Sequence, residues 1–259
     1  MNIFDAAILG IIEGLTEFLP VSSTGHLILT AEILGLPVDN FLTLFEVVIQ
    51  LGAILAIVTL YFKKFLLDWT MNKKLVVALL PSLVVGALFY PFIKSLFASP
   101  ITVVVTLFVG GIIILLTESF LAKKGESWVK VDTVDDVNYR NAFLIGLFQA
   151  VSVIPGVSRA GATILGGLFL GLRRKAVVEF SFLLAVPTMI AASAKDISEN
   201  HSVLQGANVG LLIIGFVVAY ITALFAVKFF LRYVQTNTFK PFGWYRIIIA
   251  VLFFCFIIL

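Results

Sequence analysis

The stretch EGLTEFLPVSSTGH, at Glu13–His26, interrupts a region that is otherwise almost wholly apolar. It brings together two carboxylates, a proline and a run of hydroxyl residues. An ionised side chain inside a bilayer costs at least about 2.5–3.5 kcal/mol, so such a cluster in a membrane protein indicates a functional site. Proline ends a helix, and non-helical backbone within a membrane must be sheltered by protein or line a water-filled cavity. The stretch therefore predicts a broken helix that holds a polar site inside the protein.

The composition of the chain is that of an integral membrane protein. Of its 259 residues, 61% are hydrophobic and 13% are charged, which leaves too few polar residues to cover a soluble globule. The first dozen residues lack a basic segment and a small-residue cleavage pattern, so no cleaved signal peptide is expected. The single cysteine, Cys255, excludes an internal disulfide and a thiolate metal cluster. The net charge of +3 is interpreted as a marker of topology, and no nucleic acid partner is expected.

Six apolar runs are long enough to cross a hydrocarbon core of about 30 Å, which takes about 20 helical residues. They are Phe41–Phe62, Leu75–Phe97, Ile101–Leu121, Val177–Ala194, Val209–Leu231 and Phe242–Leu259. Two further apolar regions, Ile3–Leu36 and Tyr139–Leu172, are broken at Pro20–Gly25 and Pro155–Gly161. We expect each of these to form a re-entrant helix pair. The predicted fold is an all-α polytopic membrane protein with six transmembrane helices and two re-entrant pairs.

The two broken regions resemble each other when the chain is shifted by about 136 residues. AAILGIIEGLTEFLPVSSTGHL at Ala6–Leu27 then falls on AFLIGLFQAVSVIPGVSRAGAT at Ala142–Thr163. The aligned pairs include Gly10 with Gly146, Glu13 with Gln149, Ser22 with Ser158, Ser23 with Arg159 and Gly25 with Gly161. An odd number of crossings in each half forces opposite orientations, which is the inverted repeat found in transporters. We expect one membrane domain with a first repeat at 1–122, a solvated cytoplasmic linker at 123–138 and a second, inverted repeat at 139–259.

The basic residues predict the orientation. If the six spans alternate, fifteen of the 18 Lys and Arg lie on one side, Arg246 among them; Lys94 and Lys195 lie on the other side, and Arg159 stays within the second break. By the positive-inside rule the first side is cytoplasmic. Both termini are therefore predicted on the outer side of the membrane.

Glu13 and Glu17 are the first candidate catalytic groups. They are four residues apart on a predicted helix, so they share one face and lie close together. Such a pair can act as an acid and a base, or it can hold a divalent cation, Mg²⁺ or Ca²⁺, with phosphate and water as further ligands. The residues alone leave both roles open.

The polar residues after Pro20 predict an anion site. Hydroxyls and free backbone amides are offered, where the next helix begins, by Ser22, Ser23, Thr24 and Gly25. His26 follows directly and can exchange a proton near neutral pH. The first break thus combines acid and base groups with an anion site.

The second break repeats this chemistry and adds an arginine. Ser158 repeats the hydroxyl, and Arg159 offers a planar fork suited to phosphate oxygens. A structural ion pair of Arg159 with Glu13 or Glu17 is the alternative. Five further membrane residues fit a structural and a functional role equally well: Glu46, Gln50, Glu118, Gln149 and Glu179.

At these motifs the chain resembles the undecaprenyl-diphosphate phosphatases of bacterial inner membranes, also called the bacitracin-resistance family. The resemblance covers essentially the whole chain and rests on EGLTEFLPVSSTGH at Glu13–His26, FEVVIQLG at Phe45–Gly52, PGVSRAGAT at Pro155–Thr163 and EFSFLLAVP at Glu179–Pro187. It implies removal of the terminal phosphate from a C55 polyprenyl diphosphate. That reaction regenerates the lipid carrier for cell-wall synthesis, with bacitracin resistance as a consequence.

The resemblance also implies roles for individual residues. It maps Glu13 and Glu17 onto the acidic motif of the family, Ser23 and His26 onto its first polar loop, and Ser158, Arg159 and Thr163 onto its second. With the residue chemistry above, the predicted catalytic groups are Glu13, Glu17, Ser23, His26 and Arg159, and the predicted phosphate-binding groups are Ser22, Thr24, Gly25, Ser158, Arg159 and Thr163. The chain departs from the family at Ala160, where the family usually has a serine. A hydroxyl at this position is therefore expected to be auxiliary to the reaction.

Two alternatives stay open. Either Ser23 attacks the terminal phosphorus while Glu17 or His26 takes its proton, or the same groups activate a water molecule. An inverted repeat with broken helices also suits a flippase or transporter of an anionic polyprenyl phosphate lipid. The expected partners are the polyprenyl diphosphate, membrane lipids and, in an assembly, a second copy of the chain as a homodimer.

Overall fold

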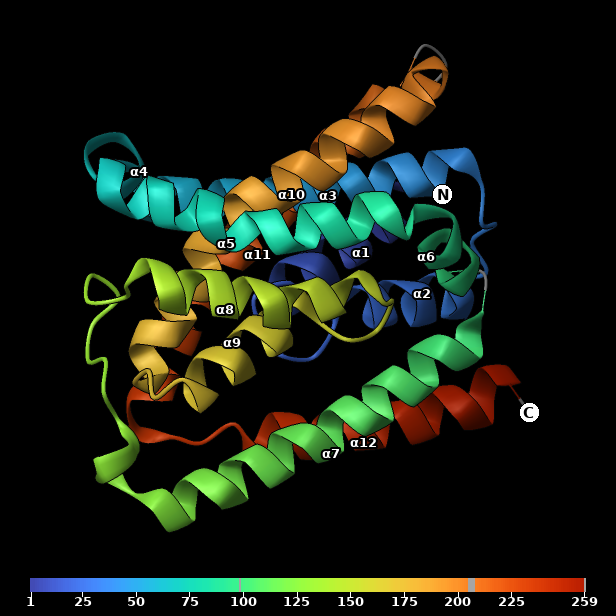
Figure 1. Ribbon diagram of the computed structural model, residues 1–259. Helices are drawn as coiled ribbons and strands as arrows, with labels where there is room; N and C mark the ends of the chain where they lie inside the picture. The colour runs from blue at the N-terminus through green and yellow to red at the C-terminus, as the bar shows by residue number, and fades with distance from the viewer. Residues whose placement is uncertain (98, 205–207, 259) are drawn as a thin grey trace.

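The computed structural model describes residues 1–97, 99–204 and 208–258, and its regular structure over these residues is helical (Figure 1). The α-helices are α1 Ile3–Thr16, α2 Ser23–Ile33, α3 Asn40–Leu60, α4 Phe62–Leu67, α5 Trp69–Leu88, α6 Tyr90–Phe97, α7 Pro100–Lys124, α8 Tyr139–Ala150, α9 Arg159–Phe169, α10 Arg174–Leu204, α11 Val209–Thr236 and α12 Lys240–Phe253. Short 3₁₀ turns follow α7 and α8 at Glu126–Trp128 and Val151–Val153. The all-α class is confirmed.

Five of the described helices are long and apolar enough to cross a membrane: α3, α5, α7, α10 and α11. The sixth expected run, Phe242–Leu259, does not reach this length. There α12 has 14 residues and continues as a π-helix at Phe254–Ile258, while Leu259 lies outside the described residues. The structure thus shows a multi-pass membrane protein with five spans by length and composition, one fewer than the six expected.

The second span begins and ends earlier than the predicted Leu75–Phe97. It is α5, at Trp69–Leu88, and the chain then turns before α6 starts at Tyr90. Pro91 explains the earlier end of the span, because a proline has no N–H to continue a helix and its ring clashes with the carbonyl of the preceding turn.

Aligned glycines let the broken regions pack closely against spanning helices. α1 packs against α11, and α8 packs against α5. A Cβ added at Gly10 would lie 2.8 Å from the carbonyl oxygen of Gly215, and one at Gly146 would overlap the backbone of Ala78. Both helix contacts therefore need a residue without a side chain. The two glycines that allow them are paired in the sequence alignment.

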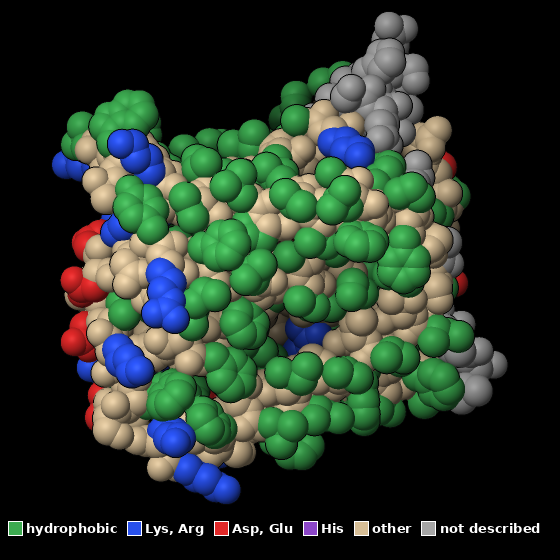
Figure 2. Space-filling model, viewed as in Figure 1, with side chains coloured by type: hydrophobic (Ala, Val, Ile, Leu, Met, Phe, Trp, Pro, Cys, Tyr) green, Lys and Arg blue, Asp and Glu red, His purple; other side chains and the backbone are tan. Residues whose placement is uncertain are grey.

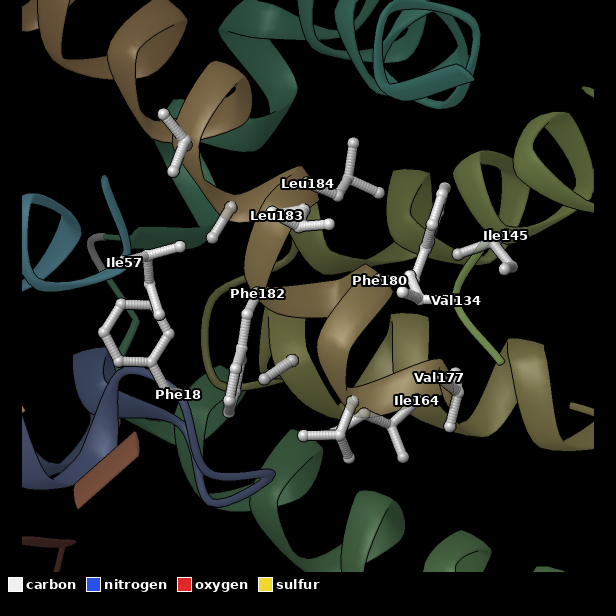
Figure 3. Packing of buried hydrophobic residues seen from close by; sticks show 14 of the residues in the cluster. Phe18, Ile57, Val134, Ile145, Ile164, Val177, Phe180, Phe182, Leu183 and Leu184 are labelled. Carbon is white, nitrogen blue, oxygen red and sulfur yellow. The ribbon is translucent and has the colours of Figure 1, made fainter. Parts of the chain in front are cut away.

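The largest buried cluster joins the first break to α9 and α10 (Figure 3). Phe18, which follows α1, is fully buried and meets Phe182 of α10 edge to face, with ring centroids 5.4 Å apart. Phe182 in turn packs on Phe230 of α11. Because Phe18 stands next to Glu17, this packing fixes the carboxylate against the second half of the chain.

The linker at 123–138 is only partly solvated. Val131, Val134 and Val137 are buried and belong to the largest apolar cluster, so these three residues of the linker are shielded from solvent. The Asp136 carboxylate is exposed, and the hydroxyl and amide of Thr133 hold its pKa below the usual value by donating to it. The valines anchor the linker against the membrane helices.

The two termini lie at one end of the molecule and the linker lies at the opposite end (Figure 1). In the same view, most Lys and Arg side chains gather at the linker end, and hydrophobic side chains cover most of the remaining face (Figure 2). This face is hollowed near its centre, where a basic side chain is visible at the floor (Figure 2). The distribution is that of an apolar belt with one strongly charged end.

Candidate active site

The two breaks have matching backbone geometry. Ser22 precedes α2 with φ 71°, and Ser158 precedes α9 with φ 76°; they are the only non-glycine residues with positive φ in the described chain. A left-handed conformation costs a non-glycine residue about 1–3 kcal/mol and is typical of functional sites. Each serine caps its helix, since its Oγ accepts from the amide of Gly25 or Gly161, at 3.4 and 3.0 Å. The pairing of Ser22 with Ser158 predicted from sequence is confirmed as a shared conformation.

The centre of the site is a contact between three buried side chains from the two halves of the chain. Arg159 Nη2 donates to Glu17 Oε1 at 3.0 Å, across 142 positions of sequence. Ser23 Oγ donates to the other oxygen of that carboxylate, Glu17 Oε2, at 2.6 Å. All three residues are less than one tenth exposed. The structure therefore brings together the predicted nucleophile, base and phosphate-binding arginine, and it also contains the ion pair that the sequence left as an alternative.

The Arg159 guanidinium is held from behind by α10. Its Nη1 donates to the carbonyl and hydroxyl oxygens of Ser181, at 2.8 and 3.1 Å. Thr163 is fully buried, and its hydroxyl lies 2.7 Å from the Ser181 hydroxyl and 3.0 Å from the carbonyl oxygen of Arg159. The ring of Phe18 lies 5.9 Å from the guanidinium carbon. Thr163 thus supports Arg159, and direct binding of phosphate by Thr163 stays a prediction.

Two polar atoms at this centre have no hydrogen-bond partner among the described residues: Glu13 Oε1 and Arg159 Nε. Glu13 is 1% exposed and lies close enough to Glu17, Glu46 and Arg159 to interact with them electrostatically. An unpaired acceptor and an unpaired donor, both buried, each lose a hydrogen bond to water on folding. They are available to a ligand that brings its own polar groups.

His26 lies beside this centre and faces α12. Its Nδ1 is 2.7 Å from the carbonyl oxygen of Ser22, and its Nε2 is 2.7 Å from the hydroxyl of Tyr245. Because a carbonyl can only accept, Nδ1 carries the proton and Nε2 accepts from Tyr245; this tautomer is assigned from the hydrogen bonds. The two rings are also stacked, with centroids 5.5 Å apart. The Ser23 hydroxyl donates to Glu17, so the geometry favours Glu17 over His26 as the base.

The remaining predicted residues lie around the start of α2 or away from the site. Thr24 and Gly25 occupy the first turn of α2, where amides lack helical partners. Gln50 lies on α3 and is half-buried. Glu179 pairs with Lys175, 4.0 Å away, which places its carboxylate with the basic residues near the start of α10.

The sequence analysis missed Ser181 and Tyr245, and it misplaced Arg246. Ser181 lies in a quoted motif, but a serine in an apolar helix has no distinctive signal. Arg246 was counted among the cytoplasmic charges, and this was wrong: it is 1% exposed and lies between the two breaks. The signal available was a Tyr-Arg pair inside the last apolar run.

Fold and site together define a polytopic membrane protein with a buried polar site at two broken helices. The family model described as Bacitracin resistance protein BacA matches residues 6–252. The chain belongs to this family, as the resemblance of its motifs indicated.

Curated relatives match over nearly their whole length. The chain is 50% identical over 254 residues to an undecaprenyl-diphosphatase of Sulfurihydrogenibium sp. (strain YO3AOP1), covering 98% of this chain and 99% of that protein. It is 45% identical over 257 residues to an undecaprenyl-diphosphatase of Aquifex aeolicus, covering 99% of both. A third undecaprenyl-diphosphatase, from Wolinella succinogenes, is 50% identical over 253 residues, covering 98% of this chain and 97% of that protein.

Proposed function

We propose that this protein is an undecaprenyl-diphosphate phosphatase that removes the terminal phosphate of the C55 lipid and regenerates the carrier for cell-wall synthesis. The observation that carries the proposal is the buried contact of Ser23, Glu17 and Arg159. A hydroxyl paired with a carboxylate, beside a guanidinium, is the arrangement that phosphoryl transfer requires. The relatives reported above carry the same activity in their names.

The geometry supports Ser23 as the nucleophile. As Ser23 Oγ attacks the terminal phosphorus, its proton passes to Glu17 Oε2, to which it already donates at 2.6 Å. The bond between that phosphorus and the bridging oxygen breaks, and the lipid monophosphate leaves with the electron pair. Glu17 passes this proton to the released lipid monophosphate, and its regenerated carboxylate takes a proton from the water that attacks the phosphoserine. The bond between phosphorus and Ser23 Oγ breaks, Oγ recovers a proton from Glu17, and inorganic phosphate is released. Attack by water in the first step is the alternative that the Ser23 variant discussed below distinguishes.

Arg159 would bind the terminal phosphoryl oxygens. Its Nε is unpaired, and its Nη2 contacts Glu17, so both can turn to an incoming phosphate while Ser181 keeps Nη1 in place. The helix starts at Ser22 and Ser158 add backbone amides and positive dipole ends. Preorganised donors of this kind act on the charge that develops in the transition state.

A divalent cation, Mg²⁺ or Ca²⁺, fits this site when it arrives with the diphosphate. In the described chain no group of three or more His, Cys, Asp or Glu is placed to hold a metal. The unpaired Glu13 Oε1 offers one hard oxygen ligand, and phosphate and water would supply the others. Such a cation would neutralise charge on the diphosphate.

The surface supports access from the bilayer. The hollow in the apolar face gives a route by which a headgroup can reach a basic side chain while its tail stays among lipids (Figure 2). We infer that the prenyl chain remains in the membrane and that only the diphosphate enters.

The finer architecture is also part of the proposal. α12 with its π-helical continuation would form the sixth crossing, and α1–α2 and α8–α9 would be re-entrant pairs of an inverted repeat. Support comes from the matched conformations of Ser22 and Ser158 and the matched packing of Gly10 and Gly146. The basic linker end would face the cytoplasm, and both termini would then lie on the outer side of the membrane.

The test is release of inorganic phosphate from undecaprenyl diphosphate by the purified protein in detergent. Without compartments, transport produces no signal, so phosphate release separates hydrolysis from the flippase alternative. Glu17→Gln should lower the rate at least about a hundredfold, the scale of losing one preorganised electrostatic group. Arg232→Ala, on the exposed side of α11, is the control. Absence of hydrolysis by the wild-type protein, with Mg²⁺ and Ca²⁺ supplied, would overturn the proposal.

A further inference from the structure

Arg246 is a buried arginine at the crossing of α12 and α7. It is 1% exposed and sits in the middle of an apolar helix. α12 packs along α7, and a Cβ added at Gly111 would lie 2.7 Å from the carbonyl oxygen of Gly243. A Cβ at Gly110 would overlap the Arg246 guanidinium itself. The backbone of α7 therefore leaves a space that the guanidinium fills.

Every N–H of this guanidinium donates to a backbone carbonyl. The acceptors are Leu107 for Nε at 3.3 Å, Pro20 and Val157 for Nη1 at 3.3 and 3.0 Å, and Thr106 and Gly156 for Nη2 at 3.0 and 2.9 Å. An arginine has five N–H donors, so its hydrogen-bonding capacity is fully used. Pro20 belongs to the first break, Gly156 and Val157 to the second, and the other two acceptors to α7. One side chain thus ties both breaks to each other and to a spanning helix.

The positive charge of Arg246 is not neutralised by a carboxylate. Within the described part of the chain, no Asp or Glu oxygen lies within 4.0 Å of it, whereas Arg159 pairs with Glu17 and Arg174 pairs with Glu118. The charge is close enough to His26 to act on it electrostatically. A Cβ at Gly161, in the first turn of α9, would lie 3.6 Å from Arg246 Nη1. The unpaired charge therefore stands directly behind the two helix starts that form the anion site.

The second break has a further attachment to α7. The hydroxyl of Thr106 lies 2.8 Å from the carbonyl oxygen of Pro155 and at the same distance from that of Thr102 in its own helix. The first break is joined to α12 by the bond from Arg246 to Pro20, and the following helix α2 by the contact of His26 with Tyr245. Arg246 itself bonds to both breaks, once to the first and twice to the second.

We propose that Arg246 is a positioning residue that sets the two broken helices against each other and holds a fixed positive charge behind the phosphate. This inference rests on the proposed function. Arg246 acts through Ser23 and Arg159, because all its own donors are occupied by protein carbonyls. A shift of about 1 Å between a nucleophile and the group that orients its target can lower a rate about a hundredfold.

The first experiment compares kcat, KM and thermal unfolding of Arg246→Lys with those of the wild-type protein in detergent. Lysine keeps the charge but has three donors for five carbonyls, so kcat should fall about a hundredfold while the folded fraction at the assay temperature is unchanged. Gly110→Ala, which displaces the guanidinium without removing it, should lower kcat in the same direction. Arg174→Lys is the matched control, with kcat near that of the wild type. A kcat within about threefold of wild type in Arg246→Lys would overturn the proposal.

A double-mutant cycle with Arg159→Lys tests whether Arg246 acts through the site. If Arg246 positions Arg159 against Ser23, the combined loss is smaller than the product of the two single losses. Multiplicative losses would show that Arg246 and Arg159 act on the rate independently, and they would reject the inference.

Hydrogen exchange supplies a readout that does not require activity. In Arg246→Gln, peptides covering 17–25 and 151–161 should both lose protection, while peptides of α3 keep theirs. Unchanged protection of the two breaks, or a uniform loss along the chain, would reject the positioning role. Absence of hydrolysis by the wild-type protein would reject the proposed function and leave this measurement valid.

Discussion

Replacing Arg159 with lysine keeps the positive charge of the site but removes its planar fork. In the structure the guanidinium bridges two partners, with Nη1 on the carbonyl and hydroxyl oxygens of Ser181 and Nη2 on Glu17. Its third nitrogen, Nε, has no hydrogen-bond partner among the described residues. A lysine ammonium is a compact point charge on a flexible stem, so it can reach Glu17 or Ser181 but cannot bridge both and leave a donor for phosphate.

The magnitude follows from the bonds that are lost. The variant loses the anchor on Ser181 or the contact to the carboxylate, together with the donor for the phosphoryl group. Hydrogen bonds to charged groups contribute about 1.5–3 kcal/mol each, so two of them correspond to about 3–6 kcal/mol. Each 1.36 kcal/mol is a factor of ten in rate, and kcat/KM should therefore fall about 10²–10⁴-fold.

The assay is phosphate release from undecaprenyl diphosphate at substrate concentrations well below KM, with thermal unfolding in the same detergent as a check of folding. Arg174→Lys is the control for replacing an ion-paired arginine by lysine. Arg174 also pairs with a buried carboxylate, that of Glu118, at 2.6 Å. An activity of Arg159→Lys within tenfold of the wild type would show that a point charge suffices and that the fork has no role in binding the phosphoryl group.

Three further perturbations test other contacts. Ser23→Ala removes the hydroxyl that donates to Glu17 and should lower hydrolysis at least about a hundredfold while abolishing labelling of the protein by ³²P-labelled substrate; full activity would mean that water attacks directly. Tyr245→Phe removes the hydrogen bond to His26 Nε2 and should lower kcat about fivefold, the equivalent of about 1 kcal/mol; an unchanged kcat would mean that the orientation of His26 does not matter. Gly14→Val should lower the unfolding temperature, because even a Cβ at this position would lie 2.6 Å from the carbonyl oxygen of Ala219; an unchanged unfolding temperature would show that α1 and α11 can separate without loss.

Much of the site could be predicted because polar and charged side chains cost free energy inside a membrane and therefore stand out in the sequence. Polar residues next to proline and glycine mark both breaks in the sequence, and the shift of about 136 residues pairs the two serines that share a left-handed conformation. An ion pair of Arg159 with Glu13 or Glu17 was only the alternative to phosphate binding, and the sequence did not distinguish the two carboxylates; the structure contains the pair with Glu17.

The buried position of Arg246 could not be predicted from the sequence, and the reason is physical. The positive-inside rule treats every Lys and Arg as a surface marker, and this holds when the side chain can reach water. The hydrogen-bond partners of Arg246 are backbone carbonyls. Every residue has such a carbonyl, so no sequence motif marks these partners. The end of α5 was missed because hydropathy continues through the turn at Phe89 into α6, although Pro91 cannot continue the hydrogen bonding of α5.

The location of Arg246 in the last helix has a consequence for biogenesis. During synthesis, Glu17 and Pro20 precede by far the two arginines that contact them, Arg159 and Arg246. Until α12 has inserted, the carbonyl groups of both breaks lack the side chain that bonds them. A polypeptide truncated ahead of α12 lacks these bonds, so we expect it to insert without a correctly positioned site.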